Sequence, residues 1–162
     1  MFLLIPVFSA VLLPPTLTKS FSPPVVAVNQ LSKITITITN PNSFDLTGAS
    51  LLDTMPAGLF TNATASTTCP NGIAGAAPSL VSFSGTIPAN GSCTITSFAF
   101  SPMPGSYQNL TNTLFSSGPP SAGGASATVD VLAAIPAMSW PVLAALALVL
   151  GGVGWLTSSR TS

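Results

Sequence analysis

The fold class of this chain is decided by one stretch of its sequence, Lys33-Ile34-Thr35-Ile36-Thr37-Ile38-Thr39. In an extended strand successive side chains point to opposite faces, so the isoleucines share one face and the threonines the other. Both residue types are β-branched, which favours a strand over a helix. One apolar face and one hydroxyl-bearing face are typical of an antiparallel sheet that covers a core on one side only.

Further segments of strand-like composition follow at short intervals, separated by turn signals such as Met55-Pro56-Ala57-Gly58 and Pro70-Asn71-Gly72. No segment between residues 16 and 133 has the apolar period of a helix. The predicted strands are residues 33–39, 48–54, 65–69, 80–84, 92–100, 107–116 and 125–132. This pattern predicts an all-β domain over residues 16–133, an immunoglobulin-like antiparallel β-sandwich.

One of these strands departs from simple alternation. In residues 92–100, Cys93 and Ile95 share a face, whereas Phe98 and Phe100 fall on the other. We expect either a β-bulge near Ser97, which would restore the phase, or a strand that is buried on both faces.

Charged residues make up 4% of the chain, against roughly 25% in an ordinary soluble domain. Such a chain has no field to attract phosphate backbones, so nucleic-acid binding is not expected. Histidine and glutamate are absent, no G-x-S-x-G motif is present, and the acidic groups Asp45, Asp53 and Asp130 are not paired in the sequence. We therefore predict no catalytic residues, no cofactor and no metal site; Asp45 and Asp53 alone are too few for calcium.

Polar residues have two other known uses in surface domains, a crosslink and glycosylation. A Lys–Asn isopeptide crosslink, which some surface sandwiches carry, would join Lys33 to Asn109 or Asn112, with Asp53 or Asp130 as its acid. The glycosylation triplets that begin at residues 62, 90 and 109 are expected to be chance in an Asn- and Thr-rich chain.

The chain has two cysteines, Cys69 and Cys93. Joined, they would close a loop of about 25 residues, which chain entropy values at about 3.5 kcal/mol. A metal site would need further ligands, and the sequence has no histidine or third cysteine to supply them. We predict a structural disulfide and an oxidising compartment, with two buried free thiols as the alternative.

The two ends of the chain differ in composition from the middle. Residues 1–15 are apolar without a basic start, and are either a weak signal peptide or a truncated start. Residues 134–162 contain an uncharged run long enough for the about 20 residues of a transmembrane helix. Trp140 and Trp155 would lie at the two interfaces, and Arg160 would place the C-terminus in the cytoplasm. The alternative is a helix packed in the core.

Several blocks of the chain resemble the bacterial surface repeats of the group called domain of unknown function eleven. They are Leu46-Thr47-Gly48, Asp53-Thr54-Met55-Pro56-Ala57-Gly58-Leu59 and Ile87-Pro88-Ala89-Asn90-Gly91-Ser92-Cys93, after the opening Leu17-Thr18-Lys19-Ser20-Phe21-Ser22-Pro23 and the run Ile34–Asn42. The resemblance covers roughly residues 16–131. It implies an immunoglobulin-like sandwich with a structural or adhesive role and no catalytic residues.

The tail resembles the IPTL-type C-terminal sorting signal of Gram-negative bacteria. The matching residues are Ile135, Pro136, Ala137, Met138 and Ser139, followed by Trp140, with Ala137 and Met138 in place of the signature Thr and Leu. The resemblance implies that an exosortase-type transpeptidase reads this box.

These observations predict a non-catalytic structural or interaction domain of a Gram-negative cell envelope, with its β-domain outside the inner membrane. The alternative is an adhesin-like module that binds a carbohydrate or a protein. That alternative would be favoured if Phe44 and Phe60 lay together on one surface.

Overall fold

The computed structural model of the chain describes residues 11–118 and 121–134. Within them the regular secondary structure consists of β-strands. In chain order these are β1 (Thr16–Ser22), β2 (Val25–Ala27), β3 (Ser32–Thr39), β4 (Leu46–Thr54), β5 (Phe60–Thr67), β6 (Ile73–Ala77), β7 (Leu80–Ile87), β8 (Ser92–Phe100), β9 (Gly105–Leu110) and β10 (Ser126–Leu132).

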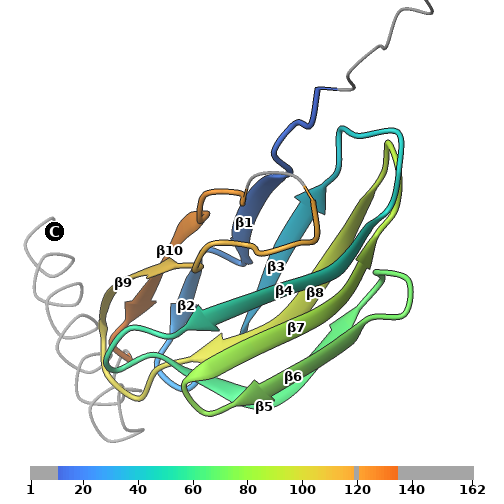
Figure 1. The fold of residues 1–162 in the computed structure, drawn as a ribbon. Helices are drawn as coiled ribbons and strands as arrows, with labels where there is room; N and C mark the ends of the chain where they lie inside the picture. The colour runs from blue at the N-terminus through green and yellow to red at the C-terminus, as the bar shows by residue number, and fades with distance from the viewer. Residues whose placement is uncertain (1–10, 119–120, 135–162) are drawn as a thin grey trace, which may run out of the picture.

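The strands form a two-layered sandwich (Figure 1). One layer is an antiparallel sheet in the order β1-β3-β8-β5, and the other consists of β2-β10-β9 and β4-β7-β6. Residues 111–117 connect the two parts of this second layer: the backbone N–H of Asn112 donates to Leu52, and Ser50 and Phe115 exchange hydrogen bonds of 2.8 and 3.0 Å. The prediction of an all-β sandwich is confirmed.

The stretch that decided the fold class forms β3, at the centre of the first layer. Ile34, Ile36 and Ile38 are at most 1% exposed, and each side chain of this size contributes about 1.5–3 kcal/mol when fully buried. They face the second layer, whose buried residues include Leu51, Val81, Phe83 and Val129. The threonines between them lie on the outer face of the sheet.

Residues 107–116 do not form the single strand that the sequence predicted. β9 ends at Leu110, because the backbone then changes partner. Residues 105–110 pair with β10, Thr111 still donates to Ala125, and Asn112 onward pairs with β4. The strands β1, β2 and β6 were not predicted, because they are edge strands that are short, polar or built from small residues.

Both expectations for the phase of β8 are wrong. The pairing of β8 with β3 is regular along its whole length, and the irregularity lies on the other neighbour, β5, between Thr61 and Ala65. Ser97 points inward and its hydroxyl donates to the Thr64 carbonyl at 2.8 Å, which satisfies the backbone at this bulge. Phe98 and Phe100 simply lie on the outer face of the sheet.

The predicted N-terminal segment lies largely outside the described residues, since residues 1–10 are not described. The same holds for residues 135–162, which contain the predicted transmembrane helix, the sorting box and Arg160. Among the residues that are described, no helix has the length and apolar character needed to cross a membrane.

Candidate functional site

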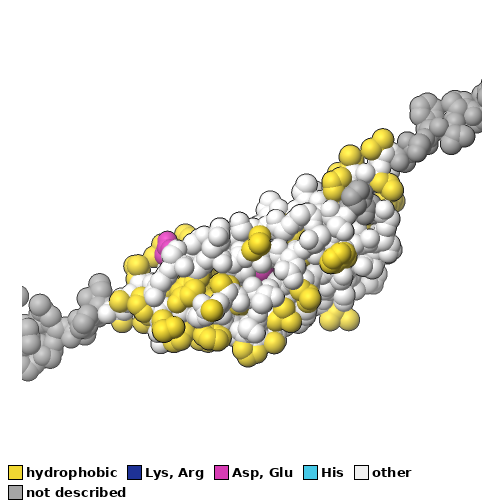
Figure 2. All heavy atoms as spheres, turned by 60° about the vertical axis from the view of Figure 1, so that its left-hand side comes forward, with side chains coloured by type: hydrophobic (Ala, Val, Ile, Leu, Met, Phe, Trp, Pro, Cys, Tyr) yellow, Lys and Arg dark blue, Asp and Glu magenta, His cyan; other side chains and the backbone are white. Residues whose placement is uncertain are grey.

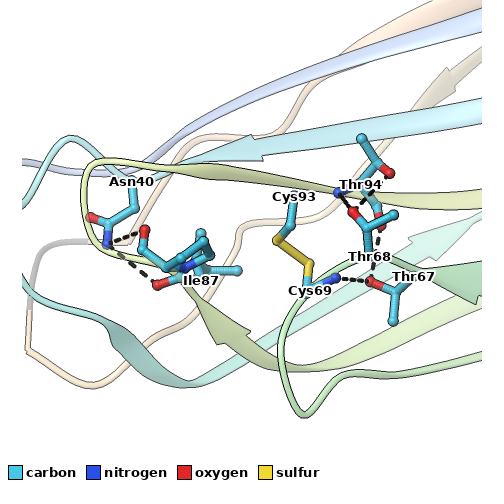
Figure 3. The surroundings of a disulfide bond; sticks show 8 residues. Asn40, Thr67, Thr68, Cys69, Ile87, Cys93 and Thr94 are labelled. Atoms are coloured by element: carbon cyan, nitrogen blue, oxygen red, sulfur yellow. Dashed lines mark hydrogen bonds between the residues drawn. A yellow bond between two sulfur atoms is a disulfide. The ribbon is translucent and has the colours of Figure 1, made fainter.

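The disulfide predicted from the sequence is present, between Cys69 and Cys93 (Figure 3). Cys93 lies on β8 and Cys69 follows the end of β5, so the bond joins two neighbouring strands of the first layer. The Cα atoms are 4.9 Å apart, and both residues are at most 5% exposed. This prediction is confirmed.

Threonine hydroxyls hold the backbone on one side of the disulfide (Figure 3). The Thr67 hydroxyl donates to the Thr94 carbonyl at 2.9 Å and accepts from the Cys69 N–H at 3.1 Å. The Thr68 hydroxyl accepts from the Thr94 N–H at 2.9 Å. The backbone pairing of β5 with β8 ends at Thr67 and Ile95. The threonine hydroxyls continue the contact between the two chain segments from there to Cys69.

A buried ion pair between Lys19 and Asp53 connects the two layers of the sandwich. Lys19 is on β1 in the first layer and Asp53 on β4 in the second. The Lys19 Nζ is 2.7 Å from Oδ1 and 2.6 Å from Oδ2 of Asp53, and neither side chain is accessible to solvent. The chain therefore places two of its few charges inside its core.

Asn109, on β9, completes this buried polar cluster. Its Nδ2 donates to the Oδ1 of Asp53 at 3.0 Å and contacts the Met55 sulfur at 3.4 Å. Its Oδ1 has no hydrogen-bond partner among the described residues, although Asn109 is fully buried. A buried carbonyl oxygen without a donor is unfavourable by about 1–3 kcal/mol, so this atom requires an explanation.

Burial sets the ionisation of the pair. Removal from water lowers the pKa of Lys19, an effect that the charge of Asp53 opposes without cancelling. Removal from water likewise raises the pKa of Asp53, against the charge of Lys19 and the hydrogen bonds from Lys19 and Asn109. Both shifts favour the neutral amine beside the neutral carboxylic acid.

The sequence predicted a different set of polar partners. Lys33 is exposed on the outer face of β3, whereas Asn109 faces the core, so the suggested pairing of Lys33 with Asn109 is wrong. Asn112 is exposed and Asp130 lies on the outside of β10. Asp45 accepts a hydrogen bond from the Ala89 N–H at 2.8 Å.

Lys19 was missed, although the sequence carries a signal for it. In Thr16–Ser22 the apolar residues Leu17 and Phe21 have the parity of the core-facing side chains, and Lys19 stands between them with the same parity. A lysine in an inward position must find an anionic or polar partner inside the sandwich. Within the described residues no group of three or more His, Cys, Asp or Glu side chains is arranged to hold a metal ion.

The outer face of the first layer is rich in hydroxyl groups and ends in a cluster of aromatic rings. Phe60 and Phe100 lie opposite each other on β5 and β8, with ring centroids 6.1 Å apart, and Phe98 is 38% exposed on the same face. Phe44 is at the other end of the sandwich, beside the start of β8, where its carbonyl accepts from Asn40. Phe44 and Phe60 therefore do not form one surface.

The surface as a whole carries little charge. Figure 2 shows a face on which most described atoms are neither hydrophobic nor charged, no Lys or Arg side chain is visible, and Asp occupies only small areas. A shallow apolar groove of about 280 Å³ lies beside β4, between Leu52, Phe83 and Phe115.

Solved structures that resemble this chain include cohesin modules. A cohesin module from a family 33 glycoside hydrolase of Clostridium perfringens has a TM-score of 0.58 at 9% identity, over 75% of this chain and 98% of that one. The third cohesin ScaC of Acetivibrio cellulolyticus, solved in complex with the ScaB dockerin, has a TM-score of 0.54 at 11% identity, over 73% and 99%. A non-cellulosomal cohesin from Archaeoglobus fulgidus has a TM-score of 0.53 at 7% identity, over 74% and 90%. At these identities the likeness concerns the fold.

No curated protein sequence matches the chain significantly. One family profile does match, over residues 15–131, which is most of the chain and includes every strand of the sandwich except the last residue of β10. The protein therefore belongs to the family described as domain of unknown function DUF7933.

Proposed function

We propose that this chain is a non-catalytic structural or interaction module of a bacterial cell envelope. The observation that carries the proposal is the disulfide between Cys69 and Cys93 inside a sandwich with very few charges. Disulfides persist in oxidising compartments and are rare in the cytosol. The domain is thus suited to a place outside the inner membrane, where a rigid neutral body presents its surface.

The C-terminal segment is the proposed means of attachment. Its composition supports a membrane-spanning helix, with Trp140 and Trp155 near the ends of the apolar run and Arg160 beyond it. The box Ile135-Pro136-Ala137-Met138-Ser139 resembles an IPTL-type sorting signal, which an exosortase-type enzyme would read. The blocks that resemble domain of unknown function eleven support a place at the bacterial surface.

The test is fractionation of a Gram-negative host that produces the full chain, with intact-mass measurement of the recovered protein. We expect the protein in the membrane fraction or at the cell surface, and in the second case shortened after Ser139. A matched chain that ends at Ala134 should be released from the membrane with its sandwich intact. Recovery of the full-length chain from the soluble cytoplasmic fraction, with Cys69 and Cys93 reduced, would contradict the proposal.

A second candidate function is binding of a carbohydrate or protein ligand through the outer face of the first layer. The exposed ring of Phe98 and the half-buried rings of Phe60 and Phe100, on a hydroxyl-rich sheet face, favour it, because aromatic side chains supply much of the binding energy at interfaces. The ScaC cohesin, which has a sandwich of similar fold and was solved with a dockerin, supports a protein as the kind of partner.

This second candidate is tested with a glycan array and a panel of envelope proteins. Phe98→Ser should weaken any binding that is found by about tenfold or more. The matched control is Phe115→Ser, which changes an exposed ring on the other layer. Equal loss in both variants, or none in Phe98→Ser, would argue against this face as the binding surface.

A further inference from the structure

The three side chains of the buried cluster have complementary reactivity: an amine, a carboxyl group and a primary amide. The Nζ of Lys19 and the Nδ2 of Asn109 both bind the same oxygen, Oδ1 of Asp53, at 2.7 and 3.0 Å. The amine is therefore held next to the amide by a group that can exchange protons with both. We propose that Lys19 and Asn109 form an intramolecular isopeptide bond in the folded protein, with Asp53 transferring the protons.

Burial prepares the nucleophile. A lysine amine attacks a carbonyl carbon only when it is unprotonated, and in water at neutral pH nearly all lysine is protonated. Here the pKa of Lys19 is lowered and the pKa of Asp53 is raised, both chiefly by burial, which favours transfer of the ammonium proton to the carboxylate. The result is a neutral amine beside a carboxylic acid, in a place that bulk solvent does not reach.

The bond changes balance without any external reagent. The Nζ lone pair of Lys19 attacks Cγ of Asn109, while the carboxylic acid of Asp53 gives its proton to the developing oxyanion. Asp53, now a carboxylate, takes a proton from the attacking nitrogen, and a proton passes to Nδ2 as the oxygen reforms the carbonyl. The Cγ–Nδ2 bond breaks and ammonia leaves. Asp53 ends protonated, as it was when the amine attacked, and nothing has been oxidised or reduced.

The unpartnered oxygen of Asn109 is explained by this chemistry. A half-turn of the amide exchanges Oδ1 and Nδ2, and brings the carbonyl oxygen to the Asp53 carboxyl group. When Asp53 is protonated, its O–H can then donate to that oxygen, which polarises the carbonyl before attack and satisfies the amide oxygen after it. In the separated state the same oxygen has no donor among the described residues.

The bond would join the two layers of the sandwich. Lys19 is in the first strand, β1, at the edge of one layer, and Asn109 is in β9 of the other. The disulfide lies within the first layer and does not cross between them. The isopeptide bond would therefore prevent separation of the layers, which the disulfide leaves possible. It is a single event within one chain and makes the protein no enzyme.

The sequence offers a sharp readout, because its only tryptic sites are Lys19, Lys33 and Arg160. Trypsin does not cut after a lysine whose side chain is an amide. The folded full-length chain is unfolded, reduced and digested, and residues 20–33 are measured by mass spectrometry. We expect almost no free 20–33 peptide. Instead the segment that ends at Lys33 should stay joined to residues 34–160, lighter by the about 17 Da of one ammonia.

Three variants assign the roles. Asp53→Asn should slow bond formation by about 10²–10⁴-fold, so that free 20–33 appears. Asp45→Asn, which changes a surface carboxylate, should leave the crosslink intact. Lys19→Arg keeps a cation against Asp53 but removes the nucleophile, so complete release of 20–33 from this variant verifies the digestion.

The digest of the wild-type chain tests the Lys19–Asn109 bond even if a core variant does not fold. Stoichiometric release of 20–33 from wild-type protein that was folded by circular dichroism would overturn the proposal, as would a fragment spectrum that places the bond at a residue other than Asn109. Full crosslinking in a folded Asp53→Asn variant would overturn the role of Asp53.

Discussion

Reduction of the Cys69–Cys93 bond should lower the free energy of unfolding by about 3.5 kcal/mol. The two cysteines are separated by 24 positions in the sequence, and closing a loop of that length removes chain entropy worth this amount from the unfolded state. The folded state should change little. Both sulfurs are buried in the core, and the threonine hydrogen bonds beside them connect the same two strands.

The assay is urea unfolding of the full chain in a mild detergent, followed by circular dichroism with and without a phosphine reductant. With a urea slope of about 1.5 kcal/mol per molar, the midpoint should fall by about 2 M. The chain has two cysteines in all, so the reductant has no other target. A Cys69→Ala, Cys93→Ala double variant should unfold near the reduced midpoint and be insensitive to the reductant.

A shift of less than about 0.5 M would refute this reasoning. It would mean that the unfolded chain is already constrained between these strands, or that the chain-entropy treatment does not apply to this loop. The double variant then distinguishes the effect of the loop from the effect of packing. If it is as stable as the oxidised protein, the loop constraint is absent, whereas a large loss in the variant alone reports the cavity that two alanines leave.

Two further predictions concern the buried pair and the turn after the disulfide. In the crosslinked chain, where Lys19 no longer titrates, the free energy of unfolding should fall as the pH rises above 3.8, the ordinary pKa of Asp53, by up to about 1.4 kcal/mol per pH unit, because the folded state keeps a proton that the unfolded state has lost. Urea titrations at several pH values should show this fall in wild type and not in Asp53→Asn. Gly72→Ala should lower stability by about 1–3 kcal/mol, because a Cβ there would lie 2.7 Å from the Cys69 carbonyl oxygen; Gly123→Ala, with no atom within 4 Å of the added carbon, should be close to neutral in the same thermal melts.

Alternation within strands predicted the fold class because the odd or even position of a residue along a strand decides whether its side chain faces the core of this sandwich. Ile34, Ile36 and Ile38 are buried as their spacing requires, and Cys93 and Ile95 follow the same rule on β8. The same alternation also holds in β8, where a bulge or burial of both faces was expected. Phe98 and Phe100 were expected to be brought inward because they are large and apolar, yet they stay outside and Ser97 goes in. On this strand the register set by β3 outweighs the hydrophobicity of single residues.

The buried cluster of Lys19, Asp53 and Asn109 could not be predicted from the sequence, for a different reason. Asp53 and Asn109 are far apart in the chain, and only the crossing from β9 to β4 through residues 111–117 brings their strands into one layer. Lys33, the lysine that the sequence suggests as a partner, lies in the strand with the clearest alternation. Its parity is outward, however, and the inward lysine is in an edge strand that the sequence did not mark.

The buried ion pair raises a question of energy that the proposed isopeptide bond answers. The chain has three basic and three acidic residues, and it places one of each in its core although removal of two charges from water costs several kcal/mol per ion. Two apolar residues of similar volume would serve stability as well or better, so simple packing gives no reason for the pair. Formation of an amide between Lys19 and Asn109 removes the titratable amine for good and leaves Asp53 as a neutral acid bonded to the new carbonyl. The alkaline branch of the pH profile separates the two states. A free Lys19 amine with a lowered pKa would make stability rise with pH up to about 10.5, because the unfolded lysine holds a proton that the folded one has lost. A crosslinked chain has no such amine, so its stability should not rise in this range, and a rise would mean that the two side chains are still separate.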